Sequence, residues 1–180
     1  MPTIRQAEPT DIPELVRLRT RFLAELRHGA GGPDGRASAG DEPSPAELAS
    51  AALLEESTAA YYGRALPAGQ FVGWLAEEAG EVVGMAGVFY FERPPMERPG
   101  AVLEGRIVNV YTRPGWRGRG IGTALTRVAV EHARARGARR VRLGTTETAR
   151  PMYERLGFRP VTRELELPLL TLFDDLPPAG

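Results

Sequence analysis

A glycine-rich stretch at residues 109–122, NVYTRPGWRGRGIG, carries the clearest chemical signal in the chain. It places Gly118, Gly120 and Gly122 directly before an amphipathic segment that predicts a helix. A turn of this kind leaves consecutive backbone N–H groups unpaired, and the dipole of the following helix attracts negative charge to the same place. The stretch therefore predicts a binding site for phosphate groups.

Two common phosphate-binding loops do not match this stretch. A Walker loop ends in Gly-Lys-Ser or Gly-Lys-Thr, whereas Gly122 is followed by Thr123 with no lysine before it. A dinucleotide fingerprint requires glycine at position 123 and an acidic residue after the next strand, where the chain has Leu143 and Gly144. Neither kind of nucleotide site is expected.

A third kind of phosphate site fits. The pattern R-x-x-G-x-G at residues 117–122, preceded by T-x-P at residues 112–114, resembles the acyl-CoA signature of the GNAT superfamily of N-acetyltransferases. Residues 146–158, TETARPMYERLGF, resemble a second signature of the same family. Two signatures in the expected order are more specific than a glycine turn alone. The resemblance, which covers residues 104–161, implies an acetyl-CoA-dependent N-acetyltransferase.

The resemblance also implies where acetyl-CoA binds. The pantetheine arm is expected in a gap between two splayed strands, paired with one of them like an added strand. The pyrophosphate is expected on the amides of the glycine turn, where the backbone can approach without a Cβ atom in the way. Thr146 stands where the family often has asparagine. The residues assigned to cofactor binding are Val110, Tyr111, Thr112, Arg117, Gly118, Arg119, Gly120, Ile121, Gly122, Thr123 and Thr146.

Acetyl transfer to an amine requires a neutral amine, a polarised thioester carbonyl and a proton for the departing thiolate. By resemblance, Tyr153 is the general acid that protonates the thiolate. A primary alkyl amine has a pKa near about 10.4, so its proton must be removed or its small neutral fraction captured. No spacing identifies the group that does so: Glu104 and Asn109 are candidates as a base or a water-positioning residue, and Glu77 and Glu92 also lie near strand ends.

The composition argues against several kinds of partner and site. The chain has 180 residues, with 23 basic and 23 acidic residues, two histidines and no cysteine. The balanced charge argues against a nucleic-acid partner, and the scarcity of histidine and cysteine argues against a metal site. Without a cysteine nucleophile, we expect the amine to attack acetyl-CoA directly in a ternary complex. No apolar run approaches the roughly 20 residues of a membrane span, so a cytoplasmic enzyme without membrane contact is expected.

A primary amine of a small molecule is the expected acceptor. Acetylation of a protein lysine or N-terminus and a non-catalytic acyl-CoA-binding module are the alternatives, and homodimerisation stays open. The acceptor site is expected to be shaped by residues 29–43, the helix at residues 44–66 and the loop at residues 93–100. His132 lies on the apolar side of a predicted helix and is therefore expected to be a core histidine.

The elements that must position these residues follow from hydrophobic periodicity. Asp11 and Glu14 have the spacing of a capping box at the start of the first helix. Strands are expected at residues 3–7, 70–77, 81–92, 104–112, 140–144, 158–161 and 162–167, and helices at residues 11–27, 44–66, 120–136 and 148–156.

This order of elements indicates a single α/β (α+β) domain over residues 1–180, with helices on both sides of a mixed sheet. By resemblance, the sheet is mostly antiparallel, contains one splayed pair of strands and is flanked by about four helices. Residues 29–43 are expected to form a flexible loop and residues 170–180 a frayed tail.

Overall fold

The computed structural model describes residues 2–27, 45–95 and 101–161 of the chain. Within these ranges, five strands form one sheet in the order β1-β2-β3-β4-β5. Neighbouring strands are antiparallel except β4 and β5, which are parallel, so the predicted mixed and mostly antiparallel sheet is confirmed. The strands are β1 (Thr3–Gln6), β2 (Phe71–Glu78), β3 (Glu81–Arg93), β4 (Val102–Thr112) and β5 (Arg140–Arg142).

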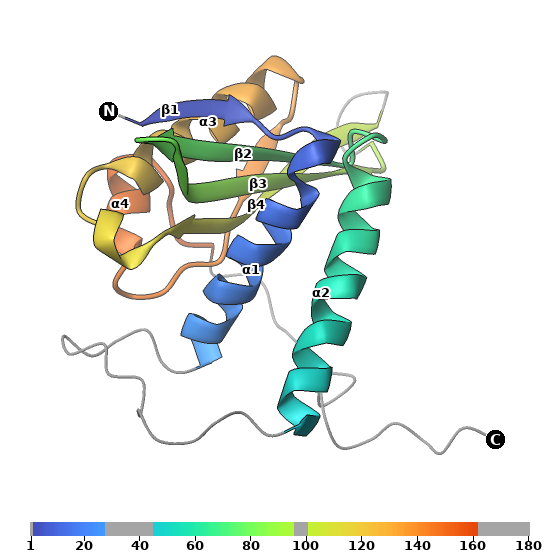
Figure 1. Cartoon of the computed structure of the whole chain (residues 1–180). Helices are drawn as coiled ribbons and strands as arrows, with labels where there is room; N and C mark the ends of the chain where they lie inside the picture. Colours follow the sequence, from blue (N-terminus) through green and yellow to red (C-terminus); the bar gives the residue numbers. More distant parts are fainter. Residues whose placement is uncertain (1, 28–44, 96–100, 162–180) are drawn as a thin grey trace.

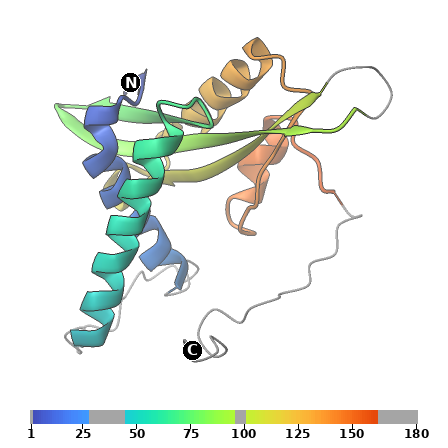
Figure 2. The ribbon, with the colours of Figure 1, turned by 90° about the vertical axis from the view of Figure 1, so that its right-hand side faces the viewer.

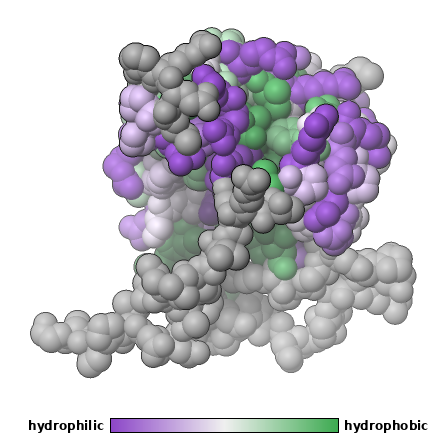
Figure 3. All heavy atoms as spheres, turned by 180° about the vertical axis from the view of Figure 1, so that it is seen from behind, coloured by the Kyte–Doolittle hydropathy of each residue, from purple (hydrophilic) through white to green (hydrophobic). Residues whose placement is uncertain are grey.

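Helices lie on both faces of this sheet. Figures 1 and 2 show α1 and α2 side by side on one face and α3 on the opposite face. On the face seen from behind, hydrophilic side chains border a strip of apolar ones (Figure 3). The helices are α1 (Ile12–Arg27), α2 (Pro45–Ala65), α3 (Ile121–Ala135) and α4 (Arg150–Arg155), with the short 3-10 turns η1 (Pro9–Asp11) and η2 (Pro114–Trp116). No helix in the described ranges has the length and apolar character that a bilayer crossing requires.

The hydrophobic core forms two clusters, one on each face of the sheet. The strand β3 contributes to both: Val83 and Val88 pack in the cluster with Leu125 of α3, whereas Met85 packs in the cluster with Leu15 of α1. A strand that is covered on both faces needs apolar residues at successive positions, which accounts for the almost continuous apolar run of β3.

A β-bulge in β4 separates this strand from β5. Asn109 and Val110 together face the single residue Ala86 of β3, so β4 carries one extra residue at this point. Asn109 has φ 54, a left-handed conformation that asparagine tolerates better than most residues. A bulge increases the local twist and bends the strand. Pairing between the two parallel strands is confined to residues 104–106 and 140–142, which gives the predicted splayed pair.

The segment after α4 differs from the prediction. A strand was expected at residues 158–161, but these residues have no regular secondary structure. Instead, the N–H of Phe158 donates to the carbonyl of Tyr153 at 3.1 Å, and the two rings pack edge to face. The segment that begins at Phe158 therefore packs against the end of α4 and does not form a strand. The expected strand at residues 162–167, the loop at residues 29–43 and the tail at residues 170–180 lie outside the described residues.

The start of the first helix also differs. The carboxylate of Asp11 accepts a hydrogen bond from the backbone N–H of Glu8 at 2.8 Å and pairs with Arg5. Glu14 pairs with Arg17 instead of capping the helix. The capping box is therefore formed by Glu8 and Asp11 around η1, one turn earlier than the spacing of Asp11 and Glu14 indicated.

Candidate active site

The glycine turn between β4 and α3 carries a row of free backbone donors. In the described part of the chain, no carbonyl or side chain accepts a hydrogen bond from the N–H groups of residues 118–123. Gly118 and Gly120 have φ values of 76° and 79°, which glycine adopts without strain, and α3 begins directly after Gly120. An oxyanion in front of this turn meets several N–H groups and the positive end of the α3 dipole. The turn is therefore suited to bind a phosphate or pyrophosphate group.

The open edge of β4 offers further backbone groups. The N–H of Arg113 donates to the carbonyl of Val83 in β3 at 2.9 Å, so the carbonyl of Thr112 in the same peptide unit points the opposite way. That carbonyl accepts a hydrogen bond from Nε of Arg117 at 3.0 Å. By the same alternation, the backbone of Tyr111 faces β3. Thr112, and not Tyr111, thus presents its backbone toward the gap.

The two arginines of the turn are held by neighbouring groups. Arg117 forms an ion pair with Glu25 of α1, whose other carboxylate oxygen accepts a hydrogen bond from the Tyr111 hydroxyl at 2.7 Å. The guanidinium of Arg119 lies 4.7 Å from the centre of the Trp116 ring. Both arginines are exposed beside the free N–H groups, but the charge of Arg117 is shared with Glu25, whereas no carboxylate of the described residues pairs with Arg119.

The first turn of α3 touches the helix that carries the predicted acid. A Cβ atom added to Gly122 would lie 3.4 Å from the sulfur of Met152, the residue before Tyr153. Ile121 is buried in the core, so only its backbone is available to a ligand. The glycine turn and α4 are therefore adjacent, although 29 residues lie between Gly122 and Met152 in the sequence.

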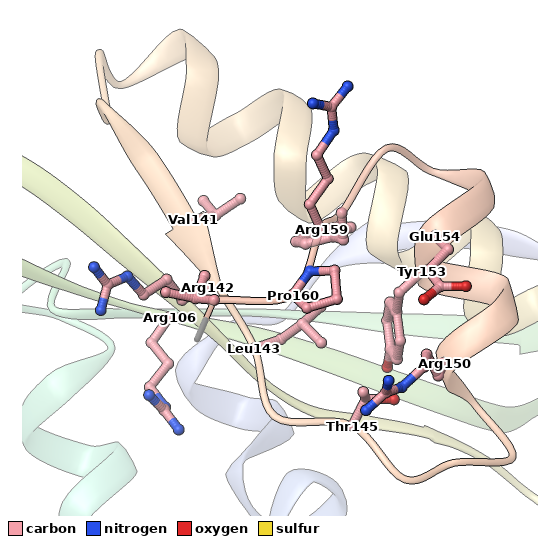
Figure 4. A pocket seen from close by; sticks show the side chains of 12 residues that line it. Arg106, Val141, Arg142, Leu143, Thr145, Arg150, Tyr153, Glu154, Arg159 and Pro160 are labelled. Atoms are coloured by element: carbon pink, nitrogen blue, oxygen red, sulfur yellow. The ribbon is translucent and has the colours of Figure 1, made fainter. Parts of the chain in front are cut away.

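Tyr153 lines a cavity of about 240 Å³ bounded by β5, α4 and the segment after α4. Its side chain is 6% exposed, and burial raises the pKa of the hydroxyl to about 12. None of the described residues hydrogen-bonds this hydroxyl. Figure 4 shows it pointing toward Thr145 and Arg150. A phenol that stays protonated and unpaired is suited to donate a proton to a departing thiolate.

Comparison with known proteins decides the family. Residues 41–158 match the model of the acetyltransferase (GNAT) family. This chain belongs to the GNAT family. The match includes both signatures, the glycine turn at residues 117–122 and the segment at residues 146–158. GNAT acetyltransferases use acetyl-CoA, which agrees with the fit of the turn to a pyrophosphate.

Individual relatives are similar over different shares of their length. Glucosamine 6-phosphate N-acetyltransferase of Trypanosoma brucei brucei is 36% identical over 93 residues, which are 52% of this chain and 61% of that protein. Glucosamine 6-phosphate N-acetyltransferase 1 of Oryza sativa subsp. japonica is 33% identical over 147 residues, 81% of this chain and 82% of that protein. A crystal structure of a predicted acetyltransferase from Clostridium acetobutylicum with acetyl-CoA has a TM-score of 0.73 and 27% identity, covering 94% of this chain and 97% of that one.

In this GNAT protein, Asn109 joins β4 to the two N-terminal helices. Its amide nitrogen donates to the hydroxyl of Tyr62 in α2 at 2.9 Å, and its oxygen accepts from Arg19 in α1 at 2.6 Å. Asn109 is buried, and burial raises the pKa of Tyr62 to about 12, so the Tyr62 hydroxyl stays protonated beside the amide. These contacts occupy both ends of the amide that was considered for positioning a water.

Glu104, the candidate base, is also engaged by the protein. Its side chain is 2% exposed and forms ion pairs with Arg140 at 3.1 Å and with Arg93 at 3.5 Å. It is not among the described residues that line the cavity of Tyr153. The structure therefore brings Tyr153 and the glycine turn together but does not bring Glu104 to them.

Two other predicted side chains have local roles. The hydroxyl of Thr146 accepts a hydrogen bond from the N–H of Ala149 at 3.3 Å, in the turn that leads into α4, whereas the neighbouring Thr145 lines the cavity. His132 was expected in the core and is half-buried at its edge: its Nδ1 lies 2.7 Å from the hydroxyl of Tyr90, its ring packs on Trp74, and partial burial lowers its pKa.

The basic lining of the cavity was not predicted. Arg106 and Arg142 lie in segments that were interpreted only as strands, and Arg150 precedes Tyr153 by three residues. All three line the cavity together with Arg159. The three-residue spacing of Arg150 and Tyr153 on a helix was the one local signal that pointed to a shared face.

Proposed function

We propose that this protein transfers an acetyl group from acetyl-CoA to the primary amine of a small molecule. One observation carries the proposal: the turn with free N–H groups at residues 118–123 packs through Gly122 against the helix that presents Tyr153 to a cavity. An acyl-CoA has a pyrophosphate at one end, which needs a phosphate-binding site, and a thioester at the other end, whose departing sulfur needs a proton donor. The activity named for the two relatives supports the same reaction class.

The residues of the site have distinct tasks. The amides of residues 118–123 would bind the pyrophosphate, with Arg117 and Arg119 adding positive charge, and Thr112 would pair with the pantetheine arm. Acetyl-CoA supplies the acetyl group as a thioester. The amine nitrogen forms the new C–N bond as the C–S bond breaks. Tyr153 gives its proton to the departing thiolate and regains one when the amine is deprotonated.

Direct attack by the amine follows from the composition. The chain contains no cysteine, so no thiol is present to accept the acetyl group. Mass spectrometry of the protein after incubation with acetyl-CoA should therefore show no acetylated intermediate. An acetyl-enzyme that passes its acetyl group to an added amine would contradict the ternary-complex mechanism.

Titration calorimetry with acetyl-CoA tests the donor site without knowledge of the acceptor. The wild-type protein should bind acetyl-CoA with a stoichiometry of one and should bind desulfo-analogues that keep the pyrophosphate. Absence of binding would overturn the proposed function.

A further inference from the structure

A carboxylate from α1 lies at the start of the glycine turn. Glu25, two residues before the end of α1, forms an ion pair with Arg117 through one carboxylate oxygen. The other oxygen accepts a hydrogen bond from the hydroxyl of Tyr111 in β4 at 2.7 Å. Because both oxygens are engaged, this one side chain connects the last turn of α1 to the end of β4 and to the turn that follows it.

Arg117 has two further contacts, both with β4. Its Nε donates to the carbonyl of Thr112 at 3.0 Å, and its guanidinium lies 5.8 Å from the centre of the Tyr111 ring. The carbonyl of Thr112 points toward the gap where the pantetheine arm is proposed to pair with β4. In this position Arg117 therefore lies on a backbone oxygen that an amide of the pantetheine arm would approach.

The carboxylate of Glu25 also lies beside a site that is suited to a negatively charged ligand. The free N–H groups of residues 118–123 follow Arg117 directly in the chain. A phosphate group bound there attracts the guanidinium of Arg117, since charge-assisted hydrogen bonds to phosphate are strong, and repels the carboxylate of Glu25. Glu25 and a bound phosphate therefore compete for the same guanidinium.

Glu25 keeps a hydrogen-bond partner when Arg117 leaves it. Burial and the hydrogen bond to Glu25 raise the pKa of Tyr111 to about 12, so its hydroxyl stays protonated and continues to donate. The Glu25 side chain is 31% exposed, so water reaches the oxygen that Arg117 has left. Separation of this ion pair therefore does not leave a buried charge without a partner, which is the costly outcome for ion pairs in a protein interior.

We propose that Glu25 lowers the affinity for acetyl-CoA by holding Arg117 until a phosphate group of the donor replaces the carboxylate. The proposal rests on the proposed acetyl transfer, which assigns the glycine turn to the donor. On binding, the guanidinium exchanges Glu25 for a phosphate oxygen and leaves the carbonyl of Thr112 to the pantetheine arm. Glu25 acts through Arg117 and is thus a positioning residue. The contact between α1 and the glycine turn is then present in the free protein and broken in the donor complex.

Titration calorimetry of acetyl-CoA with Glu25→Gln tests this exchange. Glutamine keeps the length of the side chain and an oxygen that accepts from Tyr111, but it removes the charge. The Kd should fall by about three- to fivefold, the upper part of the range for an exposed ion pair. The matched control is Glu14→Gln, which breaks the ion pair with Arg17 on the same helix and should leave the Kd unchanged. Thermal unfolding of both variants checks that they are folded.

A double-mutant cycle separates exchange on Arg117 from direct repulsion between Glu25 and the phosphates. Arg117→Gln should weaken the binding of acetyl-CoA, and Glu25→Gln in that background should lower the Kd by less than about twofold, because exposed charges are screened by water and salt. A Kd in Glu25→Gln that equals or exceeds the wild-type value would overturn the proposal. A gain that is as large without Arg117 as with it would assign the effect to direct repulsion and overturn the exchange as well.

Failure of the proposed acetyl transfer is a separate outcome. If acetyl-CoA binds and no amine releases thiol, the Kd comparisons still decide the exchange because they need no turnover. If acetyl-CoA does not bind, the proposed function fails, and titration with inorganic pyrophosphate tests the exchange at the glycine turn alone. Tighter binding of pyrophosphate by Glu25→Gln than by the wild type supports it even then. Equal binding, or no binding by either protein, contradicts it.

Discussion

Tyr153 combines burial with an unpaired hydroxyl, and this combination is what makes it suited to act as an acid. Its pKa of about 12 follows from burial alone, since the side chain faces the cavity and no described residue hydrogen-bonds it. A tyrosine that only fills space usually gives its hydroxyl a partner, as Tyr90 does with His132. The proton of Tyr153 is therefore free for the leaving thiolate.

Removal of this hydroxyl should affect turnover and spare binding. We expect Tyr153→Phe to lower kcat by about 100-fold or more, the usual contribution of a general acid, while the dissociation constant of acetyl-CoA stays within a factor of about two. Steady-state rates and calorimetry measure the two effects. Tyr61→Phe, in the aromatic cluster with Phe71 and Phe89, is the control and should keep full activity. Equal turnover in the wild type and Tyr153→Phe would contradict the assignment of Tyr153 as the general acid.

The raised pKa of Tyr153 also predicts the pH dependence. A group with a pKa of about 12 is protonated throughout the neutral and mildly basic range, so it remains competent as an acid there. The value of kcat/KM for the amine should rise with pH as the amine, with a pKa near about 10.4 in water, loses its proton. A fall in kcat/KM between about pH 8 and pH 10 would show instead that Tyr153 titrates at or below the ordinary tyrosine value.

At the scale of elements, the bulge in β4 is the feature that opens the gap beside β5. Asn109 fits this position because it adopts φ 54 and because its amide joins β4 to Arg19 and Tyr62. The asparagine thus sets both the backbone of the bulge and the distance of α1 and α2 from the sheet. It acts as a positioning residue for the site.

Substitutions at Asn109 should separate these two contributions. Asn109→Ala loses both hydrogen bonds and places a Cβ in the left-handed region, so the free energy of unfolding should fall by about 3 kcal/mol. Asn109→Gly loses the same hydrogen bonds but adopts the backbone conformation freely, so its loss should be smaller by about 1 kcal/mol. Urea unfolding measures both values, and an equal loss in the two variants would argue against backbone strain at the bulge.

The glycine turn predicts a contrast between two glycine-to-alanine substitutions. Gly120 has φ 79 and open space around its Cβ position, so Gly120→Ala should cost about 1 kcal/mol of stability through backbone strain and re-aim the N–H groups that receive phosphate. We expect the affinity for acetyl-CoA to fall at least about tenfold, the loss of one hydrogen bond to a charged group.

The control for this experiment is Gly63→Ala in α2, where the Cβ position is also open and φ is ordinary. Alanine favours a helix over glycine by roughly 0.5–1 kcal/mol, so this variant should be more stable than the wild type and bind acetyl-CoA normally. Titration calorimetry measures the affinity of both variants for acetyl-CoA. Unchanged binding in Gly120→Ala would remove the turn from the donor site.

At the scale of the whole molecule, the donor site could be predicted from the sequence because its signals are local. The glycine turn and the segment around Tyr153 depend on spacings within one loop or one short helix, and the periodic runs of β3 and α3 depend on burial of a single face. Both signatures and the order of elements therefore gave the family and the sheet correctly.

Features that depend on pairing between distant segments were not predictable in this way. That Arg106 opposes Arg142, and that Glu104 is neutralised by Arg140, follows from the register of β4 with β5, which the sequence does not encode locally. The role of Asn109 depends likewise on contacts with two helices. The expected strand at residues 158–161 failed because tertiary packing on Tyr153 outweighed its strand propensity.

The local concentration of positive charge could not be predicted from the sequence either. A chain with 23 basic and 23 acidic residues gives no indication of a charged partner, yet folding collects four arginines around one cavity. A net charge of zero argues against a strong electrostatic field around the whole molecule, but it gives no information about the charge around a single cavity. The basic lining of the cavity therefore depends on the fold, whereas the donor proposal was available from the residues.

The stoichiometry of amine-dependent thiol release by the wild-type protein with acetyl-CoA shows directly whether the protein is an acetyltransferase. Thiol release is followed over a panel of primary amines that includes glucosamine 6-phosphate, and the acetylated amine is quantified in the same samples. If the protein is an N-acetyltransferase, each thiol released is matched by one acetylated amine. Tight binding of acetyl-CoA without thiol release for any amine would contradict it and identify an acyl-CoA-binding module instead of an enzyme.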